Sequence, residues 1–217
     1  MVGGPSDCRR ALLDAIEARI GPIEPRFAAA ILAVDRARYV RQVDRDRAWV
    51  DEPQPLDTPH GQHVATVSAP HAYVLGFDAL DLRRGDRLLE LGSGSGYGAA
   101  LAAYVVGAAG YVTSIEVDPV LMRLAAELDA HLGNVTILHD DGLQRADLLA
   151  THDKCWLTFS VDRVPAPLLD ALSDGGALVA PVGVEDQRLV RYRRIGAALE
   201  ETDLGAVRFV RARGRIA

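Results

Sequence analysis

The sequence contains very little cysteine and lysine. Its two cysteines, Cys8 and Cys155, lie far apart, at no spacing typical of metal sites or disulfide frameworks. Lys154 is the only lysine, and no tyrosine precedes it at the Tyr-x-x-x-Lys spacing that a short-chain dehydrogenase requires. These deficits exclude a disulfide-rich scaffold and one large class of oxidoreductase.

Long apolar segments are also missing. No apolar run is long enough to span a bilayer, and the first seven residues lack the basic-then-apolar order of a secretory signal. The formal net charge of −6 gives no general attraction to nucleic acid or to anionic membranes. We therefore expect a cytoplasmic protein with neither a nucleic-acid nor a membrane partner. We also expect a monomer.

The chain has the size and composition of one globular domain. Its 217 residues, 49% hydrophobic and 25% charged, are enough to bury a large core. We predict a single domain over residues 1–217. Residues 1–80 form an N-terminal cap, with helices over 8–20 and 24–33 followed by a long loop-like segment from 36 to 71.

Residues 81–217 show strands alternating with helices, which predicts an α/β fold with a doubly wound, mostly parallel sheet. β-Branched and apolar runs place strands over 111–116, 135–139, 155–160 and 177–182. Two further runs, at 188–194 and 206–211, predict a late antiparallel hairpin.

A glycine-rich turn follows the apolar pair at positions 88 and 89. Residues 90–97 read Glu-Leu-Gly-Ser-Gly-Ser-Gly-Tyr and lead into an alanine-rich segment, which predicts a strand, a tight turn and a helix. Glycines allow the backbone to turn sharply and to approach a ligand closely. Because Gly94, Gly96 and Ala99 also fit the dinucleotide fingerprint, a nucleotide site and a purely structural turn remain alternatives.

The acid before this turn favours a different ligand. A carboxylate at Glu90 would repel a pyrophosphate, whereas S-adenosylmethionine carries an ammonium, a sulfonium and no phosphate. The pattern Glu-x-Gly-x-Gly-x-Gly also resembles the cofactor loop of the class I methyltransferases, whose fold is Rossmann-like. The predicted cofactor-binding residues of this loop are Glu90, Gly92, Ser93, Gly94 and Gly96.

A second acid closes the next predicted strand. Glu116 lies twenty positions after Gly96, about the distance at which such folds place a carboxylate on a ribose diol. The alternative is that Glu116 merely ends a strand at the surface. We assign Val117 to the same site, and Asp118-Pro119 supplies the start signal of the following helix.

The third predicted strand ends at Asp140-Asp141-Gly142. The resemblance to class I methyltransferases implies an acidic residue here that accepts a hydrogen bond from the adenine amino group. Asp141 fits that position better, with Gly142 supplying the turn, and Asp140 is interpreted as a solvated neighbour.

The segment ahead of the glycine loop narrows the class. Thr-Val-Ser-Ala-Pro, at positions 66–70, is similar to the T-[IV]-S-x-P motif of the protein-L-isoaspartate O-methyltransferases. Further similarity lies at 38–40, 53–56 and 175–183, and the resemblance spans roughly residues 25–211. It implies a carboxyl O-methyltransferase that methylates L-isoaspartyl residues of damaged proteins or peptides, as a step of protein repair.

The resemblance also implies site residues. Ser68 matches the active-site serine of the family, where its hydroxyl orients the acceptor carboxylate or the methionine end of the cofactor, and Thr66 contributes through its backbone. The alternative is that Ser68 only shapes the turn before Pro70. The carboxylate of the substrate is already a nucleophile and the sulfonium is already activated, so catalysis is largely alignment and desolvation.

No metal site is expected. His60, His63 and His71 share the loop before the glycine turn, but no third ligand follows at a usual spacing.

The chain departs from the family on the acceptor side. The segment between Leu56 and Thr66 is longer, Arg41 stands where a proline is expected, and residues 159–165 replace an alanine-rich stretch. Two alternatives therefore stay open. The acceptor is another carboxylate, such as an aspartate of a natural-product peptide, or the protein binds the cofactor without turnover.

Overall fold

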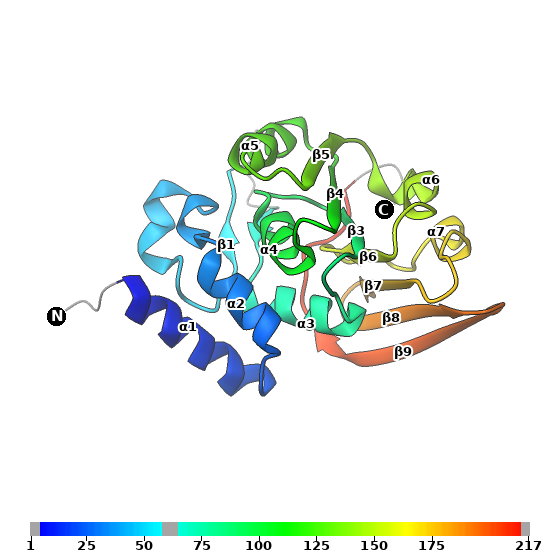
Figure 1. The fold of residues 1–217 in the computed structure, drawn as a ribbon, viewed down its shortest axis with the longest axis horizontal. Helices are drawn as coiled ribbons and strands as arrows, with labels where there is room; N and C mark the ends of the chain where they lie inside the picture. The colour runs from blue at the N-terminus through cyan, green and yellow to red at the C-terminus, as the bar shows by residue number, and fades with distance from the viewer. Residues whose placement is uncertain (1–4, 58–64, 214–217) are drawn as a thin grey trace.

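A computed structural model describes residues 5–57 and 65–213, and Figure 1 shows helices packed around a central sheet. The sheet has seven strands in the order β5-β4-β3-β6-β7-β8-β9, in which β8 runs antiparallel to both of its neighbours, β7 and β9. The strands are β3 (Arg87–Leu91), β4 (Tyr111–Glu116), β5 (Val135–His139), β6 (Lys154–Leu157), β7 (Ala177–Val182), β8 (Gln187–Ile195) and β9 (Ala198–Val207). The predicted doubly wound α/β fold with a late antiparallel hairpin is confirmed.

Helices cover both faces of the sheet. On one face lie α3 (Pro70–Leu80), α4 (Tyr97–Val106) and α5 (Pro119–Asp129), with α1 (Pro5–Ile20) and α2 (Pro25–Ala33) packed outside them. The short α6 (Ala146–Leu149) and α7 (Ala166–Asp170) lie on the opposite face. No helix within residues 5–57 and 65–213 combines the length and the apolar character needed to cross a bilayer.

The strands separate two hydrophobic cores because successive side chains of a strand point to opposite faces. Leu88 of β3 and Trp156 of β6 belong to the core under α3 and α4. Leu89 and Leu157, one position later on the same strands, belong to the core under α6 and α7. The central strands are therefore apolar on both faces, as expected for parallel strands covered by helices on each side.

The long segment from 36 to 71 contains more structure than its sequence predicts. It holds the 3₁₀ helices η1 (Arg36–Arg38) and η2 (Gln42–Arg47), and a small antiparallel pair of β1 (Gln54–Pro55) with β2 (Thr66–Val67). Helix α3 then begins at Pro70, where a proline is tolerated in the first turn. The lengthened part of this segment, residues 58–64, lies outside the described residues.

The last strand was predicted too late in the chain. β9 occupies Ala198–Val207, not 206–211, and it follows β8 through a turn at Gly196, where φ is 55°. β9 lies at the edge of the sheet, and its residues are exposed or half-buried along its whole length. An edge strand of this kind has no buried face, so no alternation of apolar and polar residues marks it.

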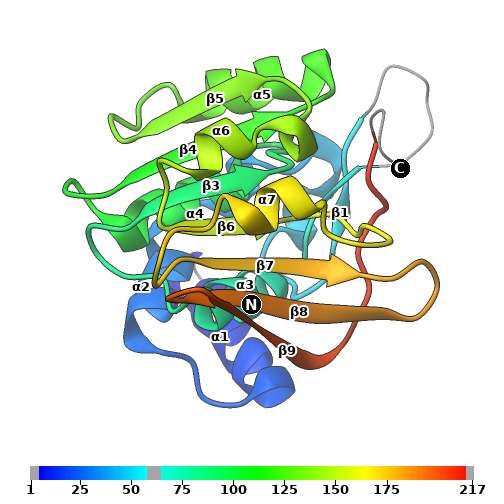
Figure 2. The ribbon, with the colours of Figure 1, turned by 90° about the vertical axis from the view of Figure 1, so that its right-hand side faces the viewer.

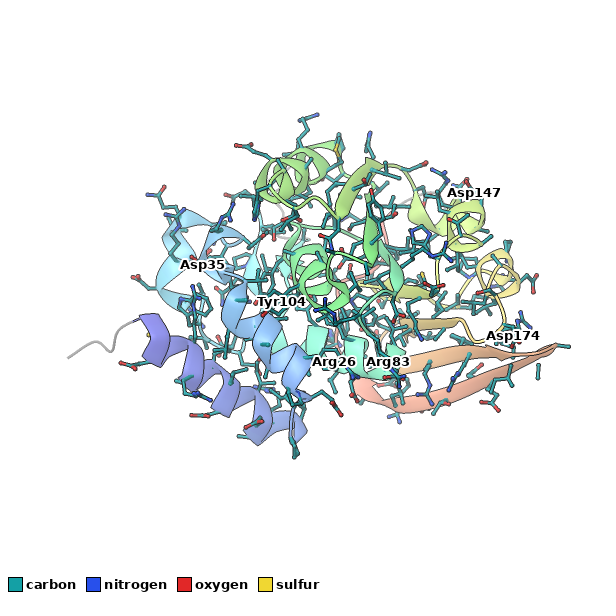
Figure 3. The ribbon with its side chains drawn as sticks, viewed as in Figure 1. Arg26, Asp35, Arg83, Tyr104, Asp147 and Asp174 are labelled. Atoms are coloured by element: carbon teal, nitrogen blue, oxygen red, sulfur yellow. The ribbon has the colours of Figure 1, made fainter. Side chains whose placement is uncertain are left out.

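Helix α3, which follows the Thr-Val-Ser-Ala-Pro segment, is held firmly at its far end. The helix stops at Asp81, whose φ of 51° is left-handed. Arg26 of α2 donates to its Oδ1 at 3.2 Å, and Arg83 donates to both of its oxygens, which lowers the pKa of Asp81. Figure 3 labels Arg26 and Arg83 near this end of the helix.

Candidate active site

The candidate site lies where the strand order reverses. From β3 the chain continues to β4 on one side, and β6 pairs with the other side of β3, so the loops after β3 and β6 diverge and leave a crevice. A cavity opens at this place. All the predicted site residues except Glu90 and Gly96 line it: Thr66, Ser68, Gly92, Ser93, Gly94, Glu116, Val117, Asp141 and Gly142.

The glycine loop runs tightly along the end of β6. Gly92 has a φ of 98°, and a Cβ built on it would lie 2.2 Å from Thr158 Oγ1. The Thr158 hydroxyl is itself close to the carbonyls of Leu91, at 3.0 Å, and Gly92, at 2.7 Å. Gly96 faces away from the cavity, since its Cβ would meet Asp129 Oδ2 at 2.5 Å. Gly92 therefore shapes the cavity wall, while Gly96 shapes the start of α4.

Glu90 lies beneath the glycine loop and does not line the cavity. Its Oε2 accepts a hydrogen bond from Ser114 Oγ at 2.5 Å, and Ser114 Oγ lies 2.6 Å from Ser93 Oγ. Glu90 is 1% exposed, and burial raises its pKa to about 8. Its carboxyl group therefore acts on the loop through Ser114 and Ser93. The sequence analysis placed a charged Glu90 at the mouth of the turn, where it would repel phosphates. That placement is wrong, because Glu90 is buried beneath the loop and does not line the cavity.

Glu116 faces the cavity from the end of β4. Its Oε2 accepts from the Gly94 N–H at 2.9 Å, and its Oε1 accepts from the Asp118 N–H at 3.0 Å. Burial raises the pKa of Glu116, and these two hydrogen bonds act against that shift. Each carboxylate oxygen can accept a further hydrogen bond. The group can therefore receive two neighbouring hydroxyls, as a ribose presents them, while it holds the glycine loop.

We expect Glu116→Ala to weaken the binding of S-adenosylhomocysteine by about 1.5–3 kcal/mol, the value of hydrogen bonds to a charged group. Calorimetric titration measures the affinity. Glu116→Gln serves as the comparison, because it keeps one oxygen acceptor without the charge. Thermal unfolding of both variants without cofactor measures what the lost contacts to Gly94 and Asp118 cost. Wild-type affinity in Glu116→Ala would remove Glu116 from the cofactor site.

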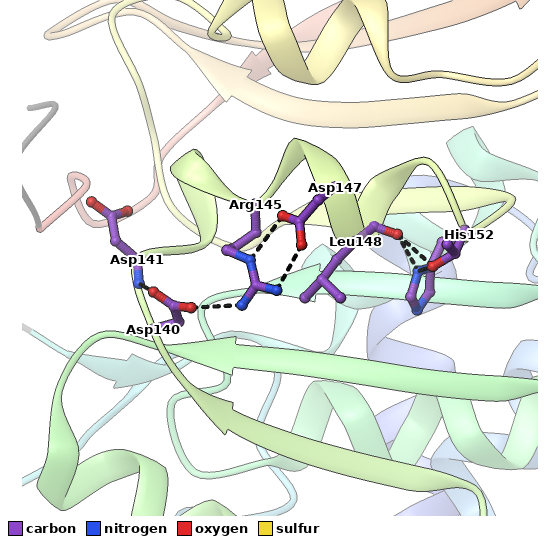
Figure 4. A network of polar contacts seen from close by, with 7 residues as sticks. Asp140, Asp141, Arg145, Asp147, Leu148 and His152 are labelled. Carbon is purple, nitrogen blue, oxygen red and sulfur yellow. Dashed lines mark hydrogen bonds and ion pairs between the residues drawn. The ribbon is translucent and has the colours of Figure 1, made fainter.

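The two aspartates after β5 have different roles. Arg145 donates to Asp140 Oδ2 at 2.6 Å and forms two further hydrogen bonds with Asp147, as Figure 4 shows. The contact with Arg145 lowers the pKa of Asp140. The side chain of Asp141 points away from Arg145 (Figure 4). Both residues line the cavity, but Asp140 forms an ion pair with Arg145, whereas Asp141 accepts from neutral donors, the Leu143 N–H at 3.2 Å and Gln144 Nε2 at 2.9 Å. Each Asp141 oxygen can accept a further hydrogen bond, which favours Asp141 as the acceptor for a ligand amino group.

Ser68 is positioned by a fully buried arginine that the sequence analysis missed. The Arg36 guanidinium donates to the Ser68 carbonyl at 3.1 Å and is 0% exposed. It also donates to the carbonyls of Ala48, Val50 and Glu52, at 2.9, 3.0 and 2.8 Å. Arg36 therefore ties the Ser68 loop to the segment before β1.

The C-terminal segment also contributes to the cavity, which the sequence analysis did not predict. The backbone N–H of Ser160 donates to the Val210 carbonyl, and the Ser160 carbonyl accepts from the Ala212 N–H, both at 2.8 Å. The C-terminal segment therefore crosses the sheet beyond the end of β6 (Figure 2). It brings Arg211 and Arg213 to the cavity wall. Arg213 lies 3.6 Å from Asp118, the N-cap residue of α5.

The three histidines of the loop bear on the expectation that the protein has no metal site. His60 and His63 lie outside the described residues. His71 Nδ1 lies 2.8 Å from Asp51 Oδ2. Across residues 5–57 and 65–213, no group of three or more histidine, cysteine, aspartate or glutamate side chains could hold a metal ion.

The fold and the site together define a class I S-adenosylmethionine-dependent methyltransferase. The family model described as protein-L-isoaspartate(D-aspartate) O-methyltransferase matches residues 9–217. The chain therefore belongs to that family of enzymes, as its Thr-Val-Ser-Ala-Pro motif predicted.

Individual relatives agree with this placement. A protein-L-isoaspartate O-methyltransferase of Methanococcus aeolicus is 40% identical over 183 residues, which cover 83% of this chain and 82% of the relative. One from Archaeoglobus fulgidus is 39% identical over 188 residues, covering 86% and 84%.

Solved structures show the same fold. A protein-L-isoaspartate O-methyltransferase structure, 25% identical, aligns with a TM-score of 0.86 over 96% of this chain and 67% of its own. A putative protein-L-isoaspartate O-methyltransferase from Plasmodium falciparum, in complex with S-adenosyl-L-homocysteine, is 24% identical. It aligns with a TM-score of 0.80 over 94% and 97% of the two chains.

Proposed function

We propose that this protein transfers the methyl group of S-adenosylmethionine to the free carboxylate of L-isoaspartyl residues in damaged proteins or peptides. Family membership supports this reaction. The observation in the structure that supports it most directly is the contact between the cofactor cavity and a neighbouring groove. Thr66, Ser68 and Val210 line both the cofactor cavity and a second groove beside it. Ser68 therefore lies at the junction of the two spaces, where a methyl donor and an acceptor would meet.

The cavity has the chemical groups that S-adenosylmethionine requires. Glu116 offers a carboxylate for the ribose hydroxyls, and Asp141 with Gly142 offers acceptors and a close backbone for the adenine. The loop at Gly92 passes so close to Thr158 that a side chain there would displace it. When bound, the cofactor supplies a methyl group on a positively charged sulfur that is already activated as a leaving group.

The acceptor needs orientation more than activation. A carboxylate carries its own negative charge, so no general base has to remove a proton. The Ser68 hydroxyl can donate to one carboxylate oxygen and leave the other aligned with the methyl group. Tyr73, which also lines the cavity, is buried, and burial raises its pKa to about 12. It therefore remains a neutral phenol beside Ser68, and it adds no negative charge that would repel the acceptor.

We further propose that the whole chain acts as one domain, in which residues 1–80 serve the acceptor side and residues 81–217 hold the cofactor. Thr66 and Ser68 come from the first part, and Glu116 and Asp141 from the second, which supports a shared site. We propose a cytoplasmic monomer that acts without nucleic acid. The net charge of −6 supports the absence of a nucleic-acid partner, and the low cysteine content supports the cytoplasmic location.

The function is tested by transfer of a tritiated methyl group to an isoaspartyl peptide and to its aspartyl twin of otherwise identical sequence. We expect incorporation into the isoaspartyl peptide and at most background incorporation into the twin. Binding of S-adenosylhomocysteine is measured in parallel by calorimetry. A protein that binds this product but methylates neither peptide, or only the aspartyl twin, would contradict the proposed acceptor.

A further inference from the structure

The second groove leads from Ser68 to the surface, between the N-terminal helices and the C-terminal segment. Its walls come from the end of α1, from the start of α3 and from residues 206–210. Given the proposed function, a peptide that presents its carboxylate at Ser68 has its neighbouring residues in this groove. The charges of the groove then decide which neighbours are favoured.

The ionisable side chains that line the described part of this groove are all basic: Arg19, His71 and Arg208. This contrasts with the protein as a whole, whose net charge is −6. Arg208 is exposed, and its Nη1 lies 3.5 Å from the carbonyl oxygen of Glu185, a neutral partner. The positive charge of Arg208 is therefore available to a ligand in the groove.

A buried carboxylate fixes the opposite wall. Asp51 is 6% exposed, and its Oδ1 accepts from the backbone N–H of His71 at 2.9 Å. Its Oδ2 lies 2.8 Å from the ring nitrogen Nδ1 of His71. Its Oδ2 also lies 3.0 Å from Arg19 Nε. Asp51 thus holds the His71 ring by Nδ1, so Nε2 of the same ring is directed away from Asp51. Asp51 also anchors Arg19, whose side chain is 56% exposed. The His71 ring and the positively charged Arg19 guanidinium therefore line the groove, while the negatively charged Asp51 carboxylate is buried behind them.

We propose that this groove selects acceptor segments that carry an acidic side chain beside the isoaspartyl residue, with Arg208 and Arg19 as the recognising groups. The inference rests on the proposed function, since it names the peptide class that the same site prefers. Exposed charge pairs contribute little each, so kcat/KM should be about three- to tenfold higher for a glutamate-flanked than for a lysine-flanked peptide. Salt should reduce the difference, because these charges are screened by solvent ions.

The test uses isoaspartyl peptides of one length in which a single flanking residue is glutamate, glutamine or lysine, scanned over both sides. Methyl transfer gives kcat/KM, and fluorescence anisotropy with saturating S-adenosylhomocysteine gives peptide affinity without turnover. Arg208→Glu is compared with Arg123→Glu, an identical charge change at an exposed residue of α5 that lines neither space. We expect the preference to reverse in Arg208→Glu and to persist in Arg123→Glu.

Equal kcat/KM and equal affinity for the three peptides in the wild-type protein would overturn the inference. So would a preference for glutamate that Arg208→Glu leaves unchanged. A glutamate preference in peptide affinity without any methyl transfer would support the charge selection and contradict the proposed acceptor, so the two failures are distinguishable.

Discussion

Gly92→Ala is expected to abolish most of the cofactor affinity, by about 100-fold or more. Alanine at a φ of 98° is strained by about 1–2 kcal/mol. Its Cβ would also meet Thr158 Oγ1 at 2.2 Å and the Phe159 ring at 2.9 Å. Overpacking of this kind costs about 1–3 kcal/mol, and the Thr158 hydroxyl cannot move without losing its contacts to two carbonyls. The variant protein can relieve this strain by displacing the glycine loop from its cofactor-binding position. Cofactor binding would then have to restore the strained position, and about 1.4 kcal/mol of that cost is a factor of ten in affinity.

Gly85→Ala is the matched control. Gly85 has a similar φ of 87°, but a Cβ on it would have no neighbour within 4 Å. Gly85→Ala therefore carries the backbone strain without the clash and lies outside the cavity. Calorimetric titration with S-adenosylhomocysteine and thermal unfolding should show two destabilised proteins, of which only Gly92→Ala loses affinity. Equal affinities in the two variants would mean that the glycine loop does not form the cofactor wall.

The parts of the fold that the sequence predicts well are those with local signals. The strand at 111–116 is confirmed with the same bounds, because its β-branched residues are followed by a clear helix start. Asp118 accepts from the N–H groups of Val120 and Leu121, as its place before Pro119 predicts. Acids at the ends of β4 and β5 could be placed near each other because parallel strands end at one edge of the sheet.

The parts that the sequence analysis missed depend on distant partners. Glu90 precedes the glycines by two positions, but β3 is buried on both faces, so position in the chain does not reveal that this side chain enters the core under α4. The partners of Arg36 are backbone carbonyls, which carry no sequence signal. Arg213 reaches the cavity only because its segment pairs with Ser160, about fifty positions earlier in the chain.

Ser68→Ala should lower the rate of methyl transfer by about ten- to a thousandfold while S-adenosylhomocysteine still binds. The hydroxyl lies where the two spaces meet, and its loss removes the hydrogen bond that orients an acceptor needing no deprotonation. Because Arg36 holds this loop through the Ser68 carbonyl, the substitution should leave the backbone in place. The measurements are kcat and KM with an isoaspartyl peptide at saturating cofactor, beside the affinity for S-adenosylhomocysteine.

Ser93→Ala is the control for loss of a hydroxyl in the same cavity. The Ser93 hydroxyl is turned toward Ser114 Oγ, 2.6 Å away, so its removal should affect the glycine loop and cofactor affinity and leave turnover at saturation close to the wild type. If kcat falls in Ser68→Ala and not in Ser93→Ala, the Ser68 hydroxyl stabilises the transition state of methyl transfer. A higher KM with unchanged kcat would mean that it binds the acceptor equally before and during transfer. Unchanged kcat and KM would leave Ser68 as a residue that only shapes the turn before Pro70.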